Sequence, residues 1–181
     1  QIAEAAQSIT VGGALNSLAQ TLLRMTVPGV PDLYQGAEFW DFSLVDPDNR
    51  RPVDYPTRRH ALHTEADPRG LLEHWRNGHI KQALIARTLA LRAEHPALFR
   101  HGRYLPLAVH GSQADRVLAF AREYQGQWLV VVVPVRVASL LQSSATPQVP
   151  APCWDDTRVT LPFSPHRQKL NGLFSTVEVT H

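Results

Sequence analysis

Apolar residues near the start of the chain recur at steps of three and four positions, as they do on one face of a helix. This stripe consists of Leu15, Leu18, Leu22 and Met25. The spacing predicts a helix over residues 14–25. Pro28 stops this helix, because proline has no backbone N–H to donate to the preceding turn and its ring clashes there.

A short apolar segment and a long polar one follow this helix. Residues 27–34 are apolar enough for a buried strand that begins near Pro31, since proline is tolerated at the first residue of a strand. Residues 35–66 are polar and contain prolines, and we interpret them as a loop. A loop of that length in a compact domain is more often functional than a plain connection.

Two further helices are predicted before residue 95. Asp67 followed by a proline is typical of an N-cap and first helical position, and opens a short helix over residues 68–75. Asn77 can cap the next helix, which runs to Glu94 before Pro96 ends it. The apolar stripe of this helix is formed by Ile80, Leu84, Arg87 and Leu91, with Ala83 and Ala90 beside them.

After about residue 100 the apolar positions alternate or form short runs, which is typical of strands. Residues 117–121 and 129–133, joined through residues 124–127, predict a β-hairpin. Residues 158–161 and 175–180 predict two more strands, and the proline-bearing segment 143–152 is expected to be a loop.

Together these patterns predict an α+β chain, with helix, strand and helix first and a small antiparallel β unit second. A single strand must pair with others and a helix face must cover something, so the first hundred residues lack partners. Position 1 is Gln1 rather than methionine. We therefore expect the chain to be a piece of a longer protein.

Composition and charge narrow the classes of protein. With 181 residues, 44% hydrophobic and 19% charged, the chain is globular rather than disordered. Its net charge of +2 gives no electrostatic case for a nucleic-acid partner. The longest apolar run, residues 128–135, is far shorter than the roughly 20 residues that span a bilayer. Cys153 has no disulfide partner and no signal-peptide pattern is seen, so we expect a cytoplasmic protein without a membrane partner.

The densest polar constellation is the segment from Asp46 to Asp54. Alternating aspartates are a feature of calcium loops, but Arg50 and Arg51 stand where an EF-hand needs Asp or Asn and then Gly. Two interpretations remain on local chemistry. Such residues are common in solvated turns, which we favour here. Alternatively, guanidinium donors and carboxylate acceptors can grip hydroxyl-rich or anionic ligands.

Other motifs for chemistry are weak or missing. His60 and His63 could share a helical face, but zinc needs three or four ligands and the single cysteine is distant in sequence. No nucleophile elbow, dinucleotide fingerprint or phosphate loop occurs. We expect neither a metal nor a cofactor. Aromatic residues near the polar segment suit sugar rings, but aromatics in a short stretch of sequence are more often packing residues; these are Tyr34, Phe39, Trp40 and Tyr55.

Three segments together resemble the C-terminal part of glycoside hydrolase family 13, the α-amylase superfamily. They are residues 16–23, 28–38 and 46–54, and the Gly-x-Pro-x-x-Tyr-x-Gly-x-Glu core within the second resembles the last barrel strand of that family. Later stretches agree, namely residues 78–84, 87–92, 99–105 and 154–162. The resemblance covers most of the chain, is strong over residues 17–55 and is weaker beyond residue 134.

The resemblance implies a division into two parts. Residues 1–100 would be the last helix–strand–helix elements of a (β/α)8 barrel with the substrate-side loop 35–66, and residues 101–181 a C-terminal β domain. The three catalytic carboxylates of the family should lie upstream of Gln1, so no catalytic residue is assigned. Active sites of such barrels lie where strands end and loops begin.

This placement favours substrate binding over a plain turn for the polar segment. Asp48 and Arg50 are the first candidates for binding glucose hydroxyls, Asp46 and Arg51 the second, and Tyr34 lies at the start of the loop. Gln35 and Glu38 either bind sugar or tie the loop to the barrel, and the sequence does not decide between these roles.

The implied reaction is that of a family member that converts the reducing-end α-1,4 linkage of a maltooligosaccharide to an α,α-1,1 linkage by intramolecular transglucosylation. The chain alone, without the carboxylates, is expected to be inactive and to self-associate through exposed barrel surface. Two alternatives stay open. One is another hydrolase or transglucosylase of the family, and the other is a non-catalytic carbohydrate-binding module.

Overall fold

The computed structural model describes residues 2–41, 51–63, 67–141, 144–163, 170–174 and 176–177. Its helices are α1 (Ile2–Thr26), α2 (Tyr55–His63), α3 (Pro68–Glu73), α4 (His79–Glu94) and α5 (Pro96–His101). Its strands are β1 (Arg103–Pro106), β2 (Val109–His110), β3 (Val117–Tyr124), β4 (Gln127–Pro134), β5 (Arg158–Val159), β6 (Leu170–Asn171) and β7 (Thr176–Val177). Short 3-10 turns are η2 (Trp75–Asn77), η3 (Ala114–Arg116), η4 (Ala138–Leu141) and η5 (Ala151–Trp154). Helices come first and antiparallel strands follow, which confirms the α+β class.

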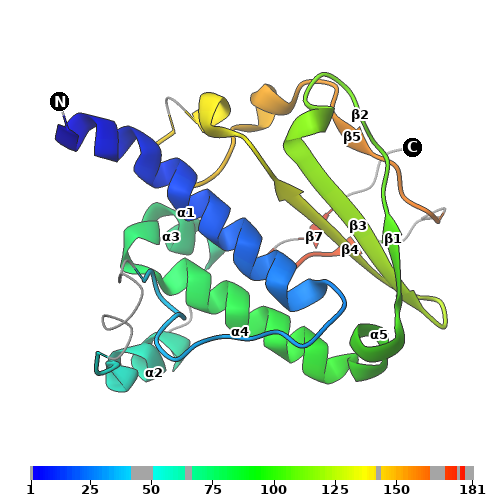
Figure 1. Cartoon of the computed structure of the whole chain (residues 1–181), viewed down its shortest axis with the longest axis horizontal. Coiled ribbons are helices and arrows are strands. Elements are labelled where there is room, and N and C mark those ends of the chain that lie inside the picture. The colour runs from blue at the N-terminus through cyan, green and yellow to red at the C-terminus, as the bar shows by residue number, and fades with distance from the viewer. Residues whose placement is uncertain are drawn as a thin grey trace.

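Helices α1 and α4 lie side by side, and the β3–β4 hairpin packs against α1 (Figure 1). Helix α2 lies near the beginning of α4, away from the sheet, whereas α5 packs against β3 at the far end of α4. The predicted division at residue 100 stays a prediction. In this structure α1 contacts elements on both sides of that residue.

The central sheet has the strand order β1-β3-β4, with antiparallel pairing throughout. Phe120 of β3 is opposite Pro106 of β1 and Val131 of β4. Two small antiparallel pairs, β2 with β5 and β6 with β7, lie outside this sheet. The predicted hairpin is confirmed, and its turn residues Gln125 and Gly126 have φ of 50° and 80°. Positive φ at both positions matches the twist of a tight hairpin.

Two buried apolar clusters hold the elements together, and α1 contributes to both. The first consists of Val11, Ala14, Leu15, Trp75, Val137, Leu141 and Val149. The second consists of Ala19, Phe120, Val131 and Val133. Successive turns of α1 contribute side chains to different clusters. Burial of this one helix therefore connects α4, the central sheet and the segment that follows β4.

The predicted helices are confirmed with some differences in their bounds. Helix α1 extends back from residue 14 to Ile2 and includes Gly12 and Gly13. Glycine lowers helix propensity, but burial of Val11 and Ala14 in the first cluster overrides it. Asp67 caps α3 as predicted, with its Oδ1 accepting a hydrogen bond from the backbone N of Gly70 over 2.8 Å.

Helix α4 differs slightly from its prediction. Its buried residues are Lys81, Gln82, Leu84, Ile85 and Thr88, so the buried face is rotated from the predicted stripe and shares Leu84 with it. Gly78 occupies the N-cap position, although the predicted cap Asn77 does accept a hydrogen bond from the backbone N of His79 over 2.9 Å.

The strand predicted over residues 27–34 is wrong. The structure has no strand between α1 and α2 among the residues it describes, and Val30 is 96% exposed. A strand is stable only when a neighbour pairs with its backbone, and no described segment does so here. The loop predicted over residues 35–66 is also partly wrong, since α2 occupies Tyr55–His63.

The later strands are shorter than predicted. Strand β5 covers Arg158–Val159 of the predicted 158–161. Strand β7 covers Thr176–Val177, and the remainder of the predicted 175–180 lies outside the described residues. In the described part of the chain, no helix is both long and apolar enough to cross a membrane.

Candidate functional site

The predicted substrate-binding residues fall in two groups. Asp46, Asp48 and Arg50 lie outside the described residues, so their roles stay predictions. Tyr34 is 49% exposed and precedes residues 42–50, whereas Arg51, which is also exposed, follows them. The described part of the site is therefore the pair of segments that flank residues 42–50.

The first flanking segment, residues 34–41, begins with a turn. The backbone N of Ala37 donates to the carbonyl oxygen of Tyr34 over 3.0 Å. Gly36 has φ of 85°, a left-handed conformation that glycine adopts without steric cost. The turn directs residues 38–40 toward the N-terminal half of α4, where their side chains become partly buried.

The second flanking segment leads into α2. Asp54 caps this helix, since its Oδ1 accepts from the backbone N of Thr57 over 3.0 Å and its Oδ2 accepts from the Thr57 hydroxyl. These two hydrogen bonds hold the pKa of the Asp54 carboxyl below its ordinary value, because they favour the ionised form. The cap therefore fixes the beginning of α2 next to the first segment.

Arg58 of α2 joins the two segments. Its Nε donates to Oε2 of Glu38 over 3.0 Å and its Nη2 to the carbonyl oxygen of Gly36 over 2.7 Å. Its Nη1 donates to the carbonyl oxygen of Asp54 over 3.1 Å, and its guanidinium lies 4.7 Å from the centre of the Phe39 ring. The ion pair with Arg58 supports the anchoring alternative for Glu38.

Two side chains of helix α4 donate hydrogen bonds to the first segment and to α2. Gln82 donates from Nε2 to the carbonyl oxygen of Arg58 over 3.0 Å. Lys81 donates from Nζ to the carbonyl oxygen of Phe39 over 3.1 Å, and its Nζ lies 5.9 Å from the centre of the Trp40 ring. Lys81 is 9% exposed, and burial lowers the pKa of its ammonium group, an effect that the Asp41 carboxylate opposes.

Trp40 anchors the end of the first segment in the first apolar cluster. Its Nε1 donates to the carbonyl oxygen of Trp75 over 2.7 Å, and the two indole rings meet edge to face with 6.1 Å between their centres. Gly78 lies so close that a Cβ there would be 2.9 Å from the Cβ of Phe39 and 3.1 Å from the backbone N of Trp40. A glycine at position 78 is thus required for the close approach of residues 39–40 to the beginning of α4.

The outer surface of this arrangement carries aromatic and amide groups. The hydroxyl of Tyr55, a residue that is 49% exposed, donates to Oε1 of Gln35 over 3.4 Å. Tyr34 is the neighbour of Gln35 in sequence and is equally exposed. Exposed tyrosines beside a side-chain amide suit a sugar, which presents an apolar ring face and an edge of hydroxyls.

Sequence reasoning did not identify Arg58, Lys81 and Gln82. The signal present for Lys81 and Gln82 is that they are polar residues next to the apolar stripe of the predicted helix. A lysine and a glutamine next to an apolar stripe of a helix look solvent-exposed until their partners are known. No local pattern marks Arg58 as the link between the two segments, since its partners in the first segment are 20 and 22 residues away in sequence.

The described structure also contains an apolar cavity of about 420 Å³ between α1, α4 and β4. Leucine, isoleucine, valine and proline side chains dominate its lining, and Phe174 borders it. Sugar binding needs several convergent polar groups. This cavity is therefore unsuited to a carbohydrate and belongs to the packing between α1 and the sheet.

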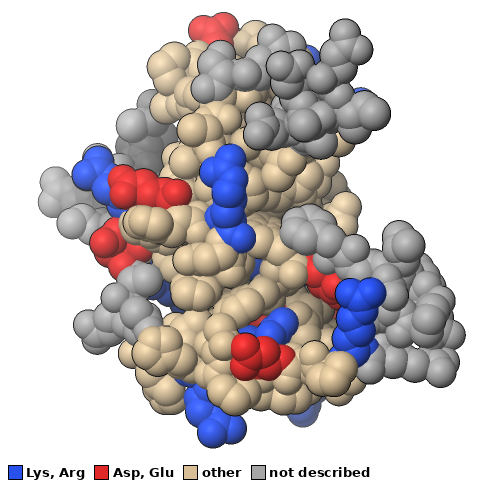
Figure 2. All heavy atoms as spheres, turned by 90° about the vertical axis from the view of Figure 1, so that its left-hand side faces the viewer, with Lys and Arg blue, Asp and Glu red and all other residues tan. Residues whose placement is uncertain are grey.

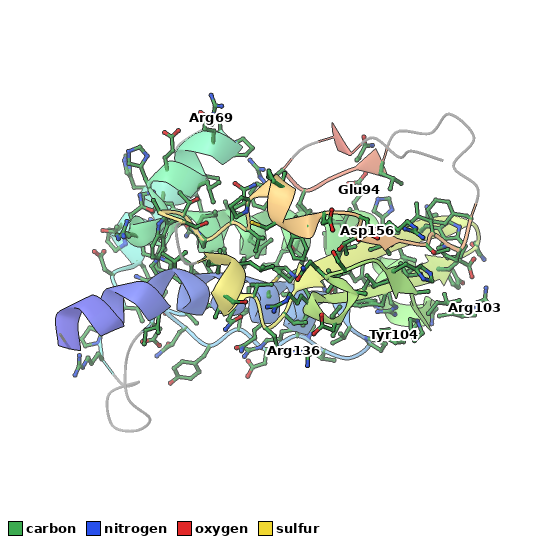
Figure 3. The ribbon with its side chains drawn as sticks, turned by 90° about the horizontal axis from the view of Figure 1, so that it is seen from above. Arg69, Glu94, Arg103, Tyr104, Arg136 and Asp156 are labelled. Carbon is green, nitrogen blue, oxygen red and sulfur yellow. The ribbon has the colours of Figure 1, made fainter. Side chains whose placement is uncertain are left out.

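Charged side chains do not gather over the end of the molecule that carries α2 and α3. On this face, among the described residues, basic and acidic side chains are intermixed or stand singly (Figure 2). Arg69 of α3 points outward, and so does Arg103 of β1 at the other end of the molecule (Figure 3). Within the described residues, no group of three or more His, Cys, Asp and Glu side chains could hold a metal ion.

Comparisons with known proteins bear on what this segment does. No protein-family model matches the chain. Over 157 residues, 87% of the chain, the sequence is 42% identical to a protein named maltooligosyl trehalose synthase from Mycobacterium tuberculosis (strain CDC 1551 / Oshkosh). The corresponding protein of strain H37Rv matches to the same extent. The chain spans 17% of the length of these relatives.

Solved structures give the same result. The structure of maltooligosyltrehalose synthase from Arthrobacter ramosus matches with a TM-score of 0.60 and 31% identity, over 83% of this chain and 18% of that one. A mutant of that enzyme matches with a TM-score of 0.61 and 32% identity, over the same shares of the two chains. In sequence and in fold, the chain is therefore a relative of the maltooligosyl trehalose synthases and matches a segment of them.

Proposed function

We propose that the chain is the C-terminal part of a maltooligosyl trehalose synthase, an isomerase of glycoside hydrolase family 13 in the α-amylase superfamily. The observation that carries the proposal is the 42% identity over 87% of the chain to proteins of that name. In this proposal, residues 1–100 complete a (β/α)8 barrel and residues 101–181 form a C-terminal β domain. The catalytic carboxylates belong to the part of the protein that precedes this chain.

The proposed reaction rearranges the reducing end of a maltooligosaccharide. The bond between the anomeric carbon of the penultimate glucose and O4 of the last glucose breaks, and that carbon forms a bond to the anomeric oxygen of the last glucose. O4 gains a proton, and the anomeric hydroxyl loses one. A retaining mechanism passes through a glycosyl-enzyme and an oxocarbenium-like transition state. No water is consumed, so the released glucose must be held in place while water is kept out.

Residues of this chain would supply part of that hold. We assign substrate binding to Asp48 and Arg50, with Asp46, Arg51 and Tyr34 as further contacts. The exposure of Tyr34 and Arg51 on either side of the segment supports the assignment. Guanidinium and carboxylate groups bind sugar hydroxyls through strong, charge-assisted hydrogen bonds.

A reducing-end assay on maltopentaose tests the proposed reaction. The full-length protein should lower the concentration of reducing ends, because the new α,α-1,1 linkage has none, whereas the chain of 181 residues alone should leave it unchanged. A rise in reducing ends would identify a hydrolase instead. Turnover by the chain alone would contradict the placement of the carboxylates.

The substrate contacts have a separate test in the full-length protein. Arg50→Ala should raise the KM for maltooligosaccharide and lower the ratio of isomerisation to hydrolysis, since the released glucose is held less firmly. If both quantities stay the same, Arg50 is not a contact. From the same proposal we expect two further results. Cell fractionation should place the full-length protein in the cytoplasmic fraction, and gel filtration should show that the isolated chain self-associates.

A further inference from the structure

Arg58 makes three hydrogen bonds and one aromatic contact in the candidate site. Its side chain is 16% exposed, and each of its three nitrogens donates to a different group. The acceptors are the Glu38 carboxylate, the Gly36 carbonyl and the Asp54 carbonyl. These groups belong to the two segments that flank residues 42–50, so one guanidinium sets the separation of the two segments.

The geometry requires a guanidinium rather than any cation. A planar fork can donate in three directions at once, whereas the ammonium of lysine is a compact point charge. The guanidinium carbon also lies 4.7 Å from the centre of the Phe39 ring, a cation–π contact that adds to the hydrogen bonds. Of the three hydrogen bonds, the one to Glu38 is an ion pair. The other two go to the neutral carbonyls of Gly36 and Asp54, and these contacts set the position of the backbone.

The helix that carries Arg58 is itself fixed. Gln82 of α4 donates to the Arg58 carbonyl, and Asp54 caps the helix at its beginning. The guanidinium therefore connects the turn at residues 34–37 to a rigid support rather than to another loop. Across the same junction, the Tyr55 hydroxyl meets the side chain of Gln35 at 3.4 Å.

We propose that Arg58 is a positioning residue that holds Tyr34 and Gln35 of the first segment beside Tyr55 of α2, so that their exposed side chains form one sugar-contacting surface. This inference rests on the proposed function, since it takes the ligand to be a maltooligosaccharide. Arg58 itself need not touch the sugar, because its nitrogens are already engaged with protein groups.

The experiment compares four variants of the full-length protein: Arg58→Ala, Arg58→Lys, Glu38→Gln and Arg59→Ala. Arg59 is the adjacent, exposed arginine of α2 and serves as the matched control. Kinetics with maltopentaose give KM and kcat separately. Amide hydrogen exchange over residues 34–41 reports how firmly the first segment is held, independently of any activity.

Arg58→Ala should raise KM about tenfold or more, since hydrogen bonds to charged groups are among the stronger ones. Its kcat should change much less than its KM, and exchange of the Ala37 amide should become faster. Arg58→Lys should recover part of KM only. Glu38→Gln should have a smaller effect than Arg58→Ala because the two carbonyl contacts remain, and Arg59→Ala should match the unsubstituted protein.

Each contrary result identifies what has failed. Unchanged exchange over residues 34–41 in Arg58→Ala overturns the positioning role, whatever the enzyme does. Faster exchange with unchanged KM overturns the sugar-contacting surface. An equal effect of Glu38→Gln and Arg58→Ala reduces the role to an ion pair and also overturns the proposal. Failure of the proposed function itself is seen in the unsubstituted protein, as absence of isomerisation.

Discussion

The guanidinium of Arg122 donates from Nη1 to the carbonyl oxygen of Thr26 over 3.1 Å, so the middle of β3 holds the last residue of α1. The same side chain donates from Nη2 to the carbonyl oxygens of Phe99 and Gly102 over 3.1 and 2.9 Å, at the end of α5. The last carbonyls of a helix have no partner within the helix. Arg122 therefore supplies donors to the last carbonyls of two helices at once.

A second arginine completes this junction. Arg92 of α4 donates from Nη1 to the carbonyl oxygen of Met25 over 2.6 Å and lies over the Phe99 ring at 4.7 Å. Arg122 is 1% exposed, and burial, followed by the nearby charge of Arg92, lowers its pKa. The negative ends of the two helix dipoles offset part of the cost of burying this charge.

The first prediction concerns this junction. Arg122→Met should lower the free energy of unfolding by about 3 kcal/mol, since each buried acceptor left without a donor costs about 1–3 kcal/mol and the removed charge returns part of that. Urea unfolding at neutral pH measures the change. Arg100→Ala, at an exposed position of α5, is the control and should stay within about 0.5 kcal/mol of the unsubstituted protein. Equal effects of the two substitutions would contradict the role of Arg122.

These contacts also show which features the sequence could and could not predict. Helix α1, the Asp67 cap and the β3–β4 hairpin follow from local spacing, caps and turns, and all were predicted. Pairing of residues 27–34 depends on a neighbour that local sequence does not name, so that strand was predicted wrongly. Arg58 and Arg122 act on backbone carbonyls far away in sequence. A carbonyl is present at every residue, and no pattern of side chains marks such a partner.

The second prediction compares two glycines with nearly the same φ. Gly78 has φ of 82° and Gly126 has φ of 80°, but a Cβ at Gly126 would meet nothing within 4 Å. Gly126→Ala should therefore cost only the left-handed conformation, about 1–2 kcal/mol. Gly78→Ala should cost about 1–3 kcal/mol more, because its Cβ would collide with Phe39 and the backbone of Trp40. Thermal or urea unfolding of the two variants measures the difference in the free energy of unfolding. Equal losses of stability would show that residues 39–40 can move away from position 78 at no cost.

The third prediction concerns acid pH. The carboxyl of Asp156 accepts a hydrogen bond at Oδ1 from the backbone N of Ser112 over 2.7 Å, and this bond and the Ser112 side chain hold its pKa below the ordinary value. A carboxyl whose pKa is lower in the folded state stabilises the protein above its unfolded pKa of about 4, and this contribution is lost as the pH falls below it.

Asp156→Asn should therefore be less stable than the unsubstituted protein at pH 7, with the gap narrowing as the pH falls from about 5 to about 2. Urea unfolding curves of both proteins at several pH values measure the gap. A gap that is constant with pH would mean that the carboxylate charge contributes nothing to the contact with Ser112.

The last prediction concerns alkaline pH and the candidate site. Burial lowers the pKa of Lys81 in the folded protein, with the Asp41 carboxylate acting in the opposite direction. Between this lowered pKa and the unfolded value of about 10.4, the unfolded chain binds more protons than the folded one, so stability rises with pH. Lys81→Met keeps much of the side-chain length and removes the titrating group. The stability of the unsubstituted protein relative to Lys81→Met should therefore increase from pH 7 to pH 10, because other titrating groups act equally in both proteins. Unfolding followed by circular dichroism at each pH gives this difference, and a constant difference would mean that the ammonium group is as well solvated beside Phe39 and Trp40 as it is in the unfolded chain.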